Sequence, residues 1–145
     1  MRVASLLVLA VLVAGCASVK PIPISAGDVC FHCRRTITDP SLAAEIISTE
    51  GHAFKFSSVV CVAEYLRDHP NEGVRAVFVA DHARNRLMEA DDAYYVSFKT
   101  PPPYTGTEFA AFRDLEKAKE FASLNHTTPV DWAGVVAANV QHVGH

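Results

Sequence analysis

The sequence lacks the motifs that mark many catalytic sites. It has no G-x-S-x-G elbow, no glycine-rich loop that could cradle a phosphate and no H-E-x-x-H pair. It also lacks an excess of positive charge, since 13 Lys and Arg residues stand against 16 Asp and Glu residues, a net charge of −3. We therefore expect neither an enzyme nor a partner of nucleic acid. Beyond Gly15, no apolar segment approaches the roughly 20 residues that a membrane-spanning helix needs.

The N-terminus has the layout of a secretory signal peptide. Arg2 is followed by a short apolar run and by small residues before Cys16. Val-Ala-Gly-Cys at positions 13–16 resembles the bacterial lipobox, in which the cysteine is diacylated and becomes the new N-terminus. We predict a lipoprotein signal peptide over residues 1–15 and lipid attachment at Cys16; an ordinary signal peptide with a chance cysteine is the alternative. Ala17 favours the periplasmic side of the outer membrane, or the outer face of the cytoplasmic membrane in a host with a single membrane.

The mature chain would contain 145 − 15 = 130 residues, enough for one domain with a substantial core. Its net charge would be 12 − 16 = −4 once Arg2 is removed. Pro21 and Pro23 disfavour a helix, so this stretch is predicted to be extended and to lift the domain off the membrane. The predicted division is a lipidated N-terminus and tether over 16–27, a domain over 28–136 and a flexible tail over 137–145.

Hydrophobic patterning predicts an α+β fold made of two tandem ββαβ units. Ser58 and Asp114 are suited to begin helices, because their side chains can accept the free N–H groups of a first helical turn. The first unit, about 43–80, would comprise strands 43–48 and 52–56, a helix 59–67 and a strand 74–80. The second unit, about 93–135, would comprise strands 93–98 and 109–112, a helix 115–124 and a closing strand 130–135. The alternative is that the second unit has the same order of strands and helix as the first by chance, without being a true repeat.

With one cysteine assigned to lipid, Cys30, Cys33 and Cys61 remain, an odd number for an oxidising compartment. Cys30 and Cys33 form a CxxC pair, whose spacing lets both sulfurs turn toward one point. Covalent haem attachment requires histidine directly after the pair, and this chain has Arg34 there. A thioredoxin-type pair begins a helix, which residues 34–40 do not favour. Metal binding is the preferred interpretation.

Cys61, in the first turn of helix 59–67, offers a third sulfur. Two or three soft sulfurs with few carboxylates nearby select Cu(I) over hard cations. Zn(II) held by three cysteines and either His32 or His52 is the competing possibility. A further alternative is a scaffold lipoprotein, stabilised by a disulfide or a zinc knuckle at the CxxC pair. We assign Met88 to the core rather than to a metal.

In order along the chain, these features resemble the NosL family, the copper-binding lipoproteins that accompany nitrous oxide reductase. The resemblance is carried by the lipobox at Cys16 and by DVCFHC at 28–33, ITDP at 37–40, AAEII at 43–47, FSS at 56–58, Cys61 with Tyr65-Leu66, FVAD at 78–81 and ADDAYYV at 90–96. It implies a doubled ββαβ fold. It also implies a Cu(I) chaperone, not an enzyme, that delivers copper to a periplasmic cuproenzyme or its assembly factors.

The sequence departs from this family at its methionines. The family often has Gly-Met after the second cysteine of the pair, where this chain has Arg34 and Arg35. A later Pro-Met-Gly-like segment of the family corresponds to Pro-Tyr-Thr-Gly at 103–106. The chain thus keeps the cysteines and lacks both characteristic thioethers. The metal ligands predicted here are Cys30, Cys33 and Cys61, with Cu(I) as the metal and Zn(II) as the alternative.

Overall fold

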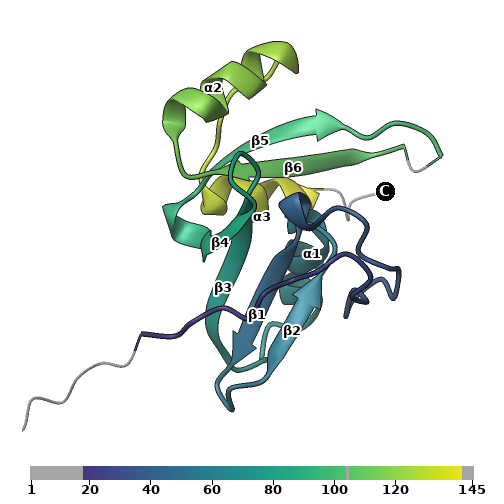
Figure 1. The fold of residues 1–145 in the computed structure, drawn as a ribbon, viewed down its shortest axis with the longest axis vertical. Helices are drawn as coiled ribbons and strands as arrows, with labels where there is room; N and C mark the ends of the chain where they lie inside the picture. Colours follow the sequence, from purple (N-terminus) through teal and green to yellow (C-terminus); the bar gives the residue numbers. More distant parts are fainter. Residues whose placement is uncertain (1–17, 104, 142–145) are drawn as a thin grey trace, which may run out of the picture.

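The computed structural model describes residues 18–103 and 105–141. Six strands form one sheet in the order β2-β1-β3-β6-β5, with β4 paired to β3 (Figure 1). The strands are β1 (Ala44–Ser48), β2 (Ala53–Phe56), β3 (Val74–Asp81), β4 (Arg86–Glu89), β5 (Tyr94–Lys99) and β6 (Thr107–Phe112). The helices are α1 (Val59–Asp68), α2 (Leu115–Leu124) and α3 (Trp132–Gln141), with 3-10 turns η1 (Pro40–Leu42) and η2 (Ala90–Asp92). Within the described ranges, no helix combines the length and the apolar character needed to cross a bilayer. The predicted signal peptide and Cys16 lie outside these ranges.

The first ββαβ unit has the predicted elements, with ends that agree to within one residue. β1 pairs with both β2 and β3 in antiparallel register, and all five of its residues are buried. Gly51 turns the chain between β1 and β2 with φ 90°, a conformation that glycine adopts without a Cβ clash. Ser58 begins α1, and its side chain accepts the Cys61 N–H at 3.1 Å. The predicted role of Ser58 as the residue that begins this helix is therefore confirmed.

The second unit joins the first through the parallel pair of β3 and β6. β5 and β6 form an antiparallel hairpin. Asp114 begins α2, and its carboxylate accepts the N–H groups of Glu116 and Lys117 at 2.9 and 3.2 Å. α2 buries Ala118 and Ala122 in a small core with β5 and β6. The α+β class is confirmed, and β6 begins two residues earlier than predicted.

The closing strand predicted over 130–135 is wrong. Val130 forms an isolated bridge with Tyr95, and the chain enters α3 at Trp132. The first part of the tail predicted over 137–145 is also wrong, because residues 137–141 are the last part of α3, and residues 142–145 lie outside the described ranges. The second unit therefore ends in a bridge and a helix instead of a strand.

The helical course of α3 has a clear physical basis. Val135 and Asn139, four residues apart, are both buried, which places them on one helical face. The Asp131 carboxylate accepts the Gly134 N–H at 2.8 Å and so satisfies a donor of the first turn. Arg67 of α1 donates to the Asn139 carbonyl at 3.3 Å, which ties α3 to α1. The valines that favoured a strand are held in a helix by this packing.

β4 is an element that the sequence pattern did not predict. It follows a tight turn in which Asn85 has φ 50° and its N–H donates to the Asp81 carbonyl at 2.7 Å. Only four residues pair with β3, and Met88 among them is buried in the core, as predicted for that side chain. Such a short strand carries too little alternation to stand out.

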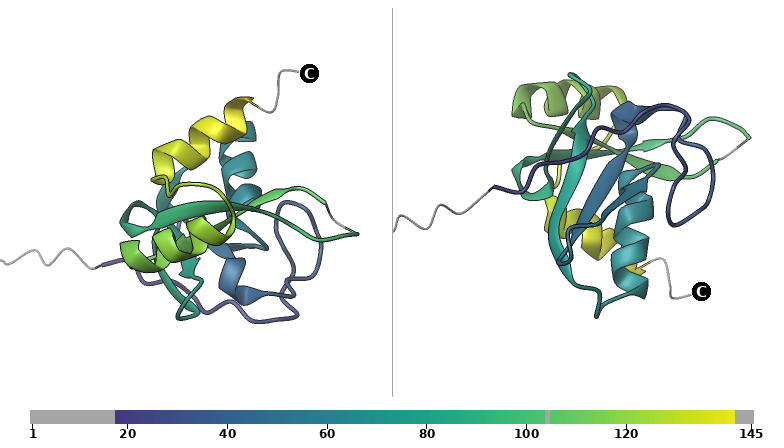
Figure 2. Two further views of the ribbon diagram at one scale, coloured as in Figure 1. Left: turned by 90° about the horizontal axis from the view of Figure 1, so that it is seen from above. Right: turned by 60° about the horizontal axis from the view of Figure 1, so that its bottom comes forward.

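Residues 19–24, which we call the strap, lie across the sheet. They are extended, without helix or strand, as the two prolines predicted. Figure 2 shows the strap on one side of the β1–β3 part of the sheet and α1 with α3 on the other. The Ile22 N–H donates to Glu45 Oε1 at 2.9 Å, and Ile24 packs against the main core. The strap thus packs against the folded domain, although the sequence predicted that residues 16–27 form a tether.

Glu45 is a wholly buried carboxylic acid in the middle of the sheet. Its Oε1 accepts the strap N–H, and its Oε2 has no hydrogen-bond partner among the described residues. Burial raises the pKa of this carboxyl, while the Ile22 N–H and the Lys55 ammonium oppose that shift. Burial of this carboxyl thus disfavours its charged form.

Glu45→Gln is expected to remove one source of pH-dependent instability. The ordinary pKa of this carboxyl is 4.5, and folding raises it. Below about pH 4.5, both the folded and the unfolded protein therefore hold the proton. As pH rises above that value the unfolded chain loses the proton first, so the wild type loses stability up to the folded-state pKa. Denaturant unfolding at pH 4 and pH 8 measures this. At pH 8 the variant should have a higher free energy of unfolding than the wild type, and at pH 4 it should not. An equal difference between the two proteins at both pH values would contradict the prediction.

Candidate metal centre

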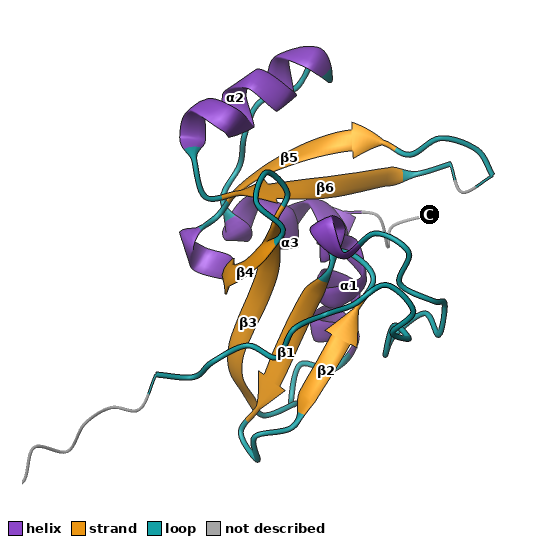
Figure 3. Cartoon of the chain, viewed as in Figure 1, coloured by secondary structure: helices purple, strands orange, loops and turns teal. Residues whose placement is uncertain are grey.

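The CxxC pair lies on a tight loop beside β2, at the edge of the sheet (Figure 3). We call residues 29–36 the knuckle, since Val29 and Thr36 form a bridge that closes it. Arg34 adopts φ 61°, and its N–H donates to the Cys30 carbonyl at 3.0 Å. The chain directly after the pair, residues 34–36, is not helical, as predicted. The pair therefore lacks the helix N-terminus that lowers the thiol pKa in thioredoxin-type sites.

The knuckle is fixed to β2 by polar and apolar contacts. The Phe31 N–H donates to the Lys55 carbonyl at 2.7 Å. The Lys55 ammonium also pairs with the Asp28 carboxylate at 2.7 Å, and this hydrogen bond lowers the pKa of Asp28. The Phe31 ring lies 4.5 Å from the Phe54 ring, centroid to centroid. These contacts hold the loop in one place relative to the start of α1.

The structure brings the three predicted cysteines together. The sulfurs of Cys30, Cys33 and Cys61 all lie within 4.8 Å of one another, and all three are free thiols. Cys30 is fully buried, Cys61 is 7% exposed and Cys33 is half-buried. With metal–sulfur bonds of about 2.3 Å, ligand sulfurs lie about 4 Å apart. Small side-chain rotations would therefore close this cluster around one ion.

Ser57 adds a hydroxyl to the cluster that sequence reasoning missed. Its Oγ lies 3.6 Å from the Cys33 sulfur and 3.5 Å from the Cys61 sulfur. The sequence signal is slight: a hydroxyl residue next to a helix cap and four positions before a cysteine. The Ser57 side chain and N–H also reach the sulfur of Cys30. Ser57 thus touches all three cysteines.

Hydrogen bonds make Cys30 the preferred thiolate. The Cys61 thiol donates to its sulfur, and the N–H groups of Cys33 and Ser57 point at it as well. These donors hold the pKa of the Cys30 thiol well below its usual range. Donation to Cys30, together with burial, raises the pKa of the Cys61 thiol. The two sulfurs therefore share a proton that an entering soft cation would displace.

Aromatic rings enclose one side of the site. The Phe31 ring lies 5.6 Å from Tyr65, and Tyr65 lies 5.3 Å from Phe56, all as centroid distances. Phe56 and Tyr65 are buried in the same core cluster as Cys30 and Cys61. Apolar surroundings exclude water and suit soft, polarisable ligands.

The histidines considered as fourth ligands lie elsewhere. His32 Nε2 is 3.4 Å from Glu64 Oε2 of α1, so this ring is engaged at the helix surface. His52 is exposed in the turn between β1 and β2. Among the described residues, the cluster comprises the three cysteines without a histidine or a carboxylate. The donor set is therefore all sulfur.

A cavity of about 480 Å³ opens beside Cys61. Ser57 and residues of the knuckle line one side of it, and Thr107 and Glu108 of β6 line the other. Glu108 Oε1 accepts the Val60 N–H at 3.2 Å, and burial raises the pKa of the Glu108 carboxyl. The cluster thus has an apolar side and a side that polar groups can approach.

No curated protein matches the chain significantly in sequence. Its fold is similar to the crystal structure of the copper chaperone NosL from Shewanella denitrificans, with a TM-score of 0.67 and 18% sequence identity. That similarity covers 79% of this chain and 94% of the other. The family model described as NosL matches residues 21–137, which is most of the sequence. The ordered motifs, the fold and this match agree, and the chain belongs to the NosL family.

Proposed function

We propose that the protein is a lipid-anchored carrier of Cu(I), on the periplasmic side of the outer membrane, that hands copper to a periplasmic cuproenzyme such as nitrous oxide reductase. The observation that carries this proposal is the convergence of the Cys30, Cys33 and Cys61 sulfurs within 4.8 Å of one another. A carrier binds its cargo and releases it unchanged. We therefore propose no enzymatic activity.

The donor set favours Cu(I) over Zn(II) as the cargo. Thiolates are soft ligands that select Cu(I), and neither oxygen nor imidazole ligands join the cluster in the described part of the chain. Structural zinc sites are almost always tetrahedral and take four ligands. The family and the similarity in fold to the Shewanella denitrificans copper chaperone support copper as the cargo.

Delivery requires that a client reach the bound ion before the carrier releases it. Cys33 is half-buried on the surface loop, and Cys61 borders the cavity of about 480 Å³. A sulfur or imidazole of the client could then bind the ion while the buried Cys30 still holds it. This order of exchange transfers Cu(I) without freeing it into solution.

The lipid anchor would keep the carrier near clients at the same membrane. Diacylation at Cys16 provides two acyl chains, and two lipid signals give stable anchoring. Confinement at a surface raises the effective concentration of one partner for the other. The anchor thus supports delivery without adding to the affinity for metal.

Replacing one of the three cysteines with serine should weaken Cu(I) binding by at least about tenfold, because the ion loses a soft ligand. The measurement is a titration of the reduced full-length protein against a Cu(I) chelator of known affinity. His52→Ala is a matched control, since that exposed side chain lies in a distant turn. Wild-type affinity in the Cys30→Ser/Cys33→Ser variant would falsify the ligand assignment.

A thiol count on protein purified from the periplasm separates the carrier from a disulfide scaffold. We expect three reactive thiols after removal of bound copper, since all three cysteines are free in the structure. A single reactive thiol with no bound metal would favour a structural disulfide. Stoichiometric zinc in the purified protein would favour the zinc knuckle.

Ser57→Ala should reduce Cu(I) affinity by about tenfold, because the hydroxyl orients two of the sulfurs. Ser97→Ala is the control, since that hydroxyl bonds Thr127 at 3.2 Å, away from the thiols. Both variants are compared by the same chelator competition and by thermal unfolding. Equal affinities would show that the Ser57 hydroxyl does not act on the metal.

Cys16→Ser should move the protein from the membrane fraction to the soluble fraction, because it removes the acylated thiol. Metabolic labelling with palmitate measures acylation, and fractionation measures location. Cu(I) affinity should stay unchanged, since the proposed ligands are Cys30, Cys33 and Cys61. A variant that still incorporates palmitate and remains in the membrane would disprove this anchor.

A further inference from the structure

The strap, residues 19–24, makes half of the predicted tether over 16–27 part of the folded domain. The Ile22 N–H binds Glu45 at 2.9 Å, and Ile24 packs against the core. Val19, at the other end, lines a cavity together with residues of β3 and Trp132 of α3. Contacts therefore extend along the strap from its first residue to its last. Residues 16–18 alone separate the strap from the predicted start of the mature chain.

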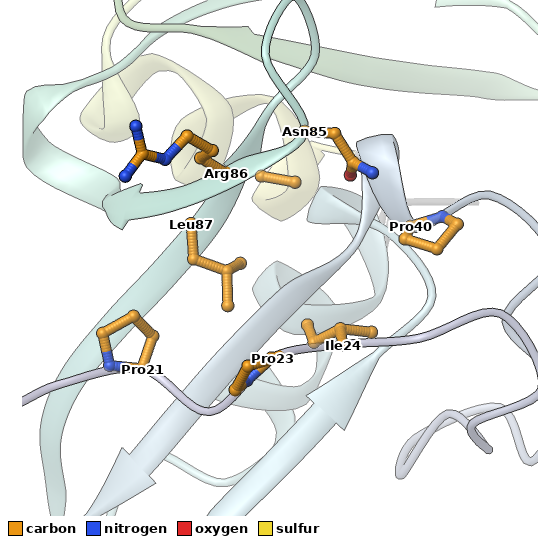
Figure 4. Close-up of a pocket in the computed structure, with 8 residues that line it drawn as sticks. Pro21, Pro23, Ile24, Pro40, Asn85, Arg86 and Leu87 are labelled. Atoms are coloured by element: carbon orange, nitrogen blue, oxygen red, sulfur yellow. The ribbon is translucent and has the colours of Figure 1, made fainter.

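The middle of the strap lies against β4. Pro21, Pro23 and Ile24 border a cavity of about 270 Å³ whose opposite side includes Arg86 and Leu87 (Figure 4). The prolines restrict the backbone before it docks, so less conformational entropy is lost on docking. The strap is thus suited to a fixed position.

Glu45 makes the polar contact that holds the strap, and we call this residue the latch. Its carboxyl is wholly buried and accepts the Ile22 N–H of the strap. A buried carboxyl without a second partner is costly, and hydration would relieve it if the strap left. The complete burial of this group therefore depends on a docked strap.

We propose that the strap is a fixed spacer that holds the domain against the membrane, with the β3–β4 side toward the lipid and the thiol cluster on the opposite side. This inference rests on the proposed lipid attachment at Cys16. The three residues from Cys16 to Ser18 reach at most about 10 Å when fully extended. The partner of the β3–β4 side is accordingly a lipid surface.

The course of the chain sets the orientation. The strap begins beside β3, where Val19 and Val74 line one cavity, and reaches β1 at Glu45. It then continues into the knuckle, which is bonded to β2 at Lys55. All views in Figures 1 and 2 place the N-terminal end and the knuckle on opposite sides of the molecule. The knuckle therefore lies on the side away from the start of the strap, where a client can approach it.

Spacer length, rather than charge, sets this orientation. The side near the start of the strap carries the exposed cations Lys20, Arg75 and Arg86, and also the exposed anions Glu89 and Asp91. Such a mixed surface has little net attraction for anionic headgroups, and salt screens what there is. The orientation should therefore be the same on neutral and anionic vesicles and at low and high salt.

Two insertions of the same length test the proposal. The acylated full-length protein is reconstituted in phosphatidylcholine vesicles that contain a dansyl-labelled lipid. Energy transfer from Trp132, the single tryptophan, reports its distance from the headgroups. Eight Gly/Ser residues between Ser18 and Val19 add up to about 27 Å of chain and should abolish most of the transfer. The same insertion between Ser25 and Ala26 lies beyond the strap and should leave transfer at the wild-type level.

A free tether predicts a different result. Both insertions would then reduce transfer equally, and that outcome would overturn the proposal. Glu45→Ala gives a second test, since loss of the latch should release the strap and lower transfer. Glu45→Gln keeps an oxygen acceptor for the Ile22 N–H and should therefore retain the wild-type energy transfer. Equal transfer in these two variants would also contradict the fixed spacer.

Failure of the proposed function would look different. Each sample is also assayed for Cu(I) affinity and for flotation with the vesicles. Protein that does not float lacks the anchor, and protein that floats without binding copper is not a copper carrier. Anchored, copper-binding protein with equal transfer loss in both insertions would reject the fixed spacer alone.

Discussion

The backbone hydrogen bond from the Phe31 N–H to the Lys55 carbonyl holds the CxxC loop against β2. The remaining geometry of the thiol cluster depends on this attachment. β2 ends at Phe56, and α1 begins directly after the Ser58 cap, so the first turn of α1 lies close to the docked loop. Cys61 can meet a pair of cysteines about 30 positions earlier only because the sheet edge brings both segments together. Without this attachment, the CxxC pair would not lie close to the sulfur of Cys61.

The two sides of the cluster serve different physical needs. Aromatic rings on one side lower the local polarity and exclude water, which suits soft ligands. Hydroxyl and N–H groups around Ser57 stabilise negative charge on sulfur. The cavity beside Cys61 leaves a route for a client ligand. Retention and exchange of a metal are thus assigned to opposite sides of one site.

Local rules predicted the elements whose causes are local. Ser58 and Asp114 begin helices because their side chains bind N–H groups two or three residues away. β3 follows from a run of β-branched residues that fits a buried strand. α3 did not follow, because its valines favour a strand in isolation. Its bonds and packing against α1 decide the helix, and those contacts join residues far apart in the chain.

The sequence by itself determined the chemical inventory: a tetrad that resembles a lipobox, three further cysteines, two helix caps and the order of most strands. Each depends on residue identity or on neighbours within a few positions. The tertiary structure alone decided that Cys61 meets the CxxC pair, that Ser57 bonds two of those sulfurs, and that the strap docks on Glu45. These contacts join segments separated by 20 residues or more, apart from Ser57 and Cys61 within one turn. Their geometry arises when the sheet folds, so spacing along the chain does not encode it directly.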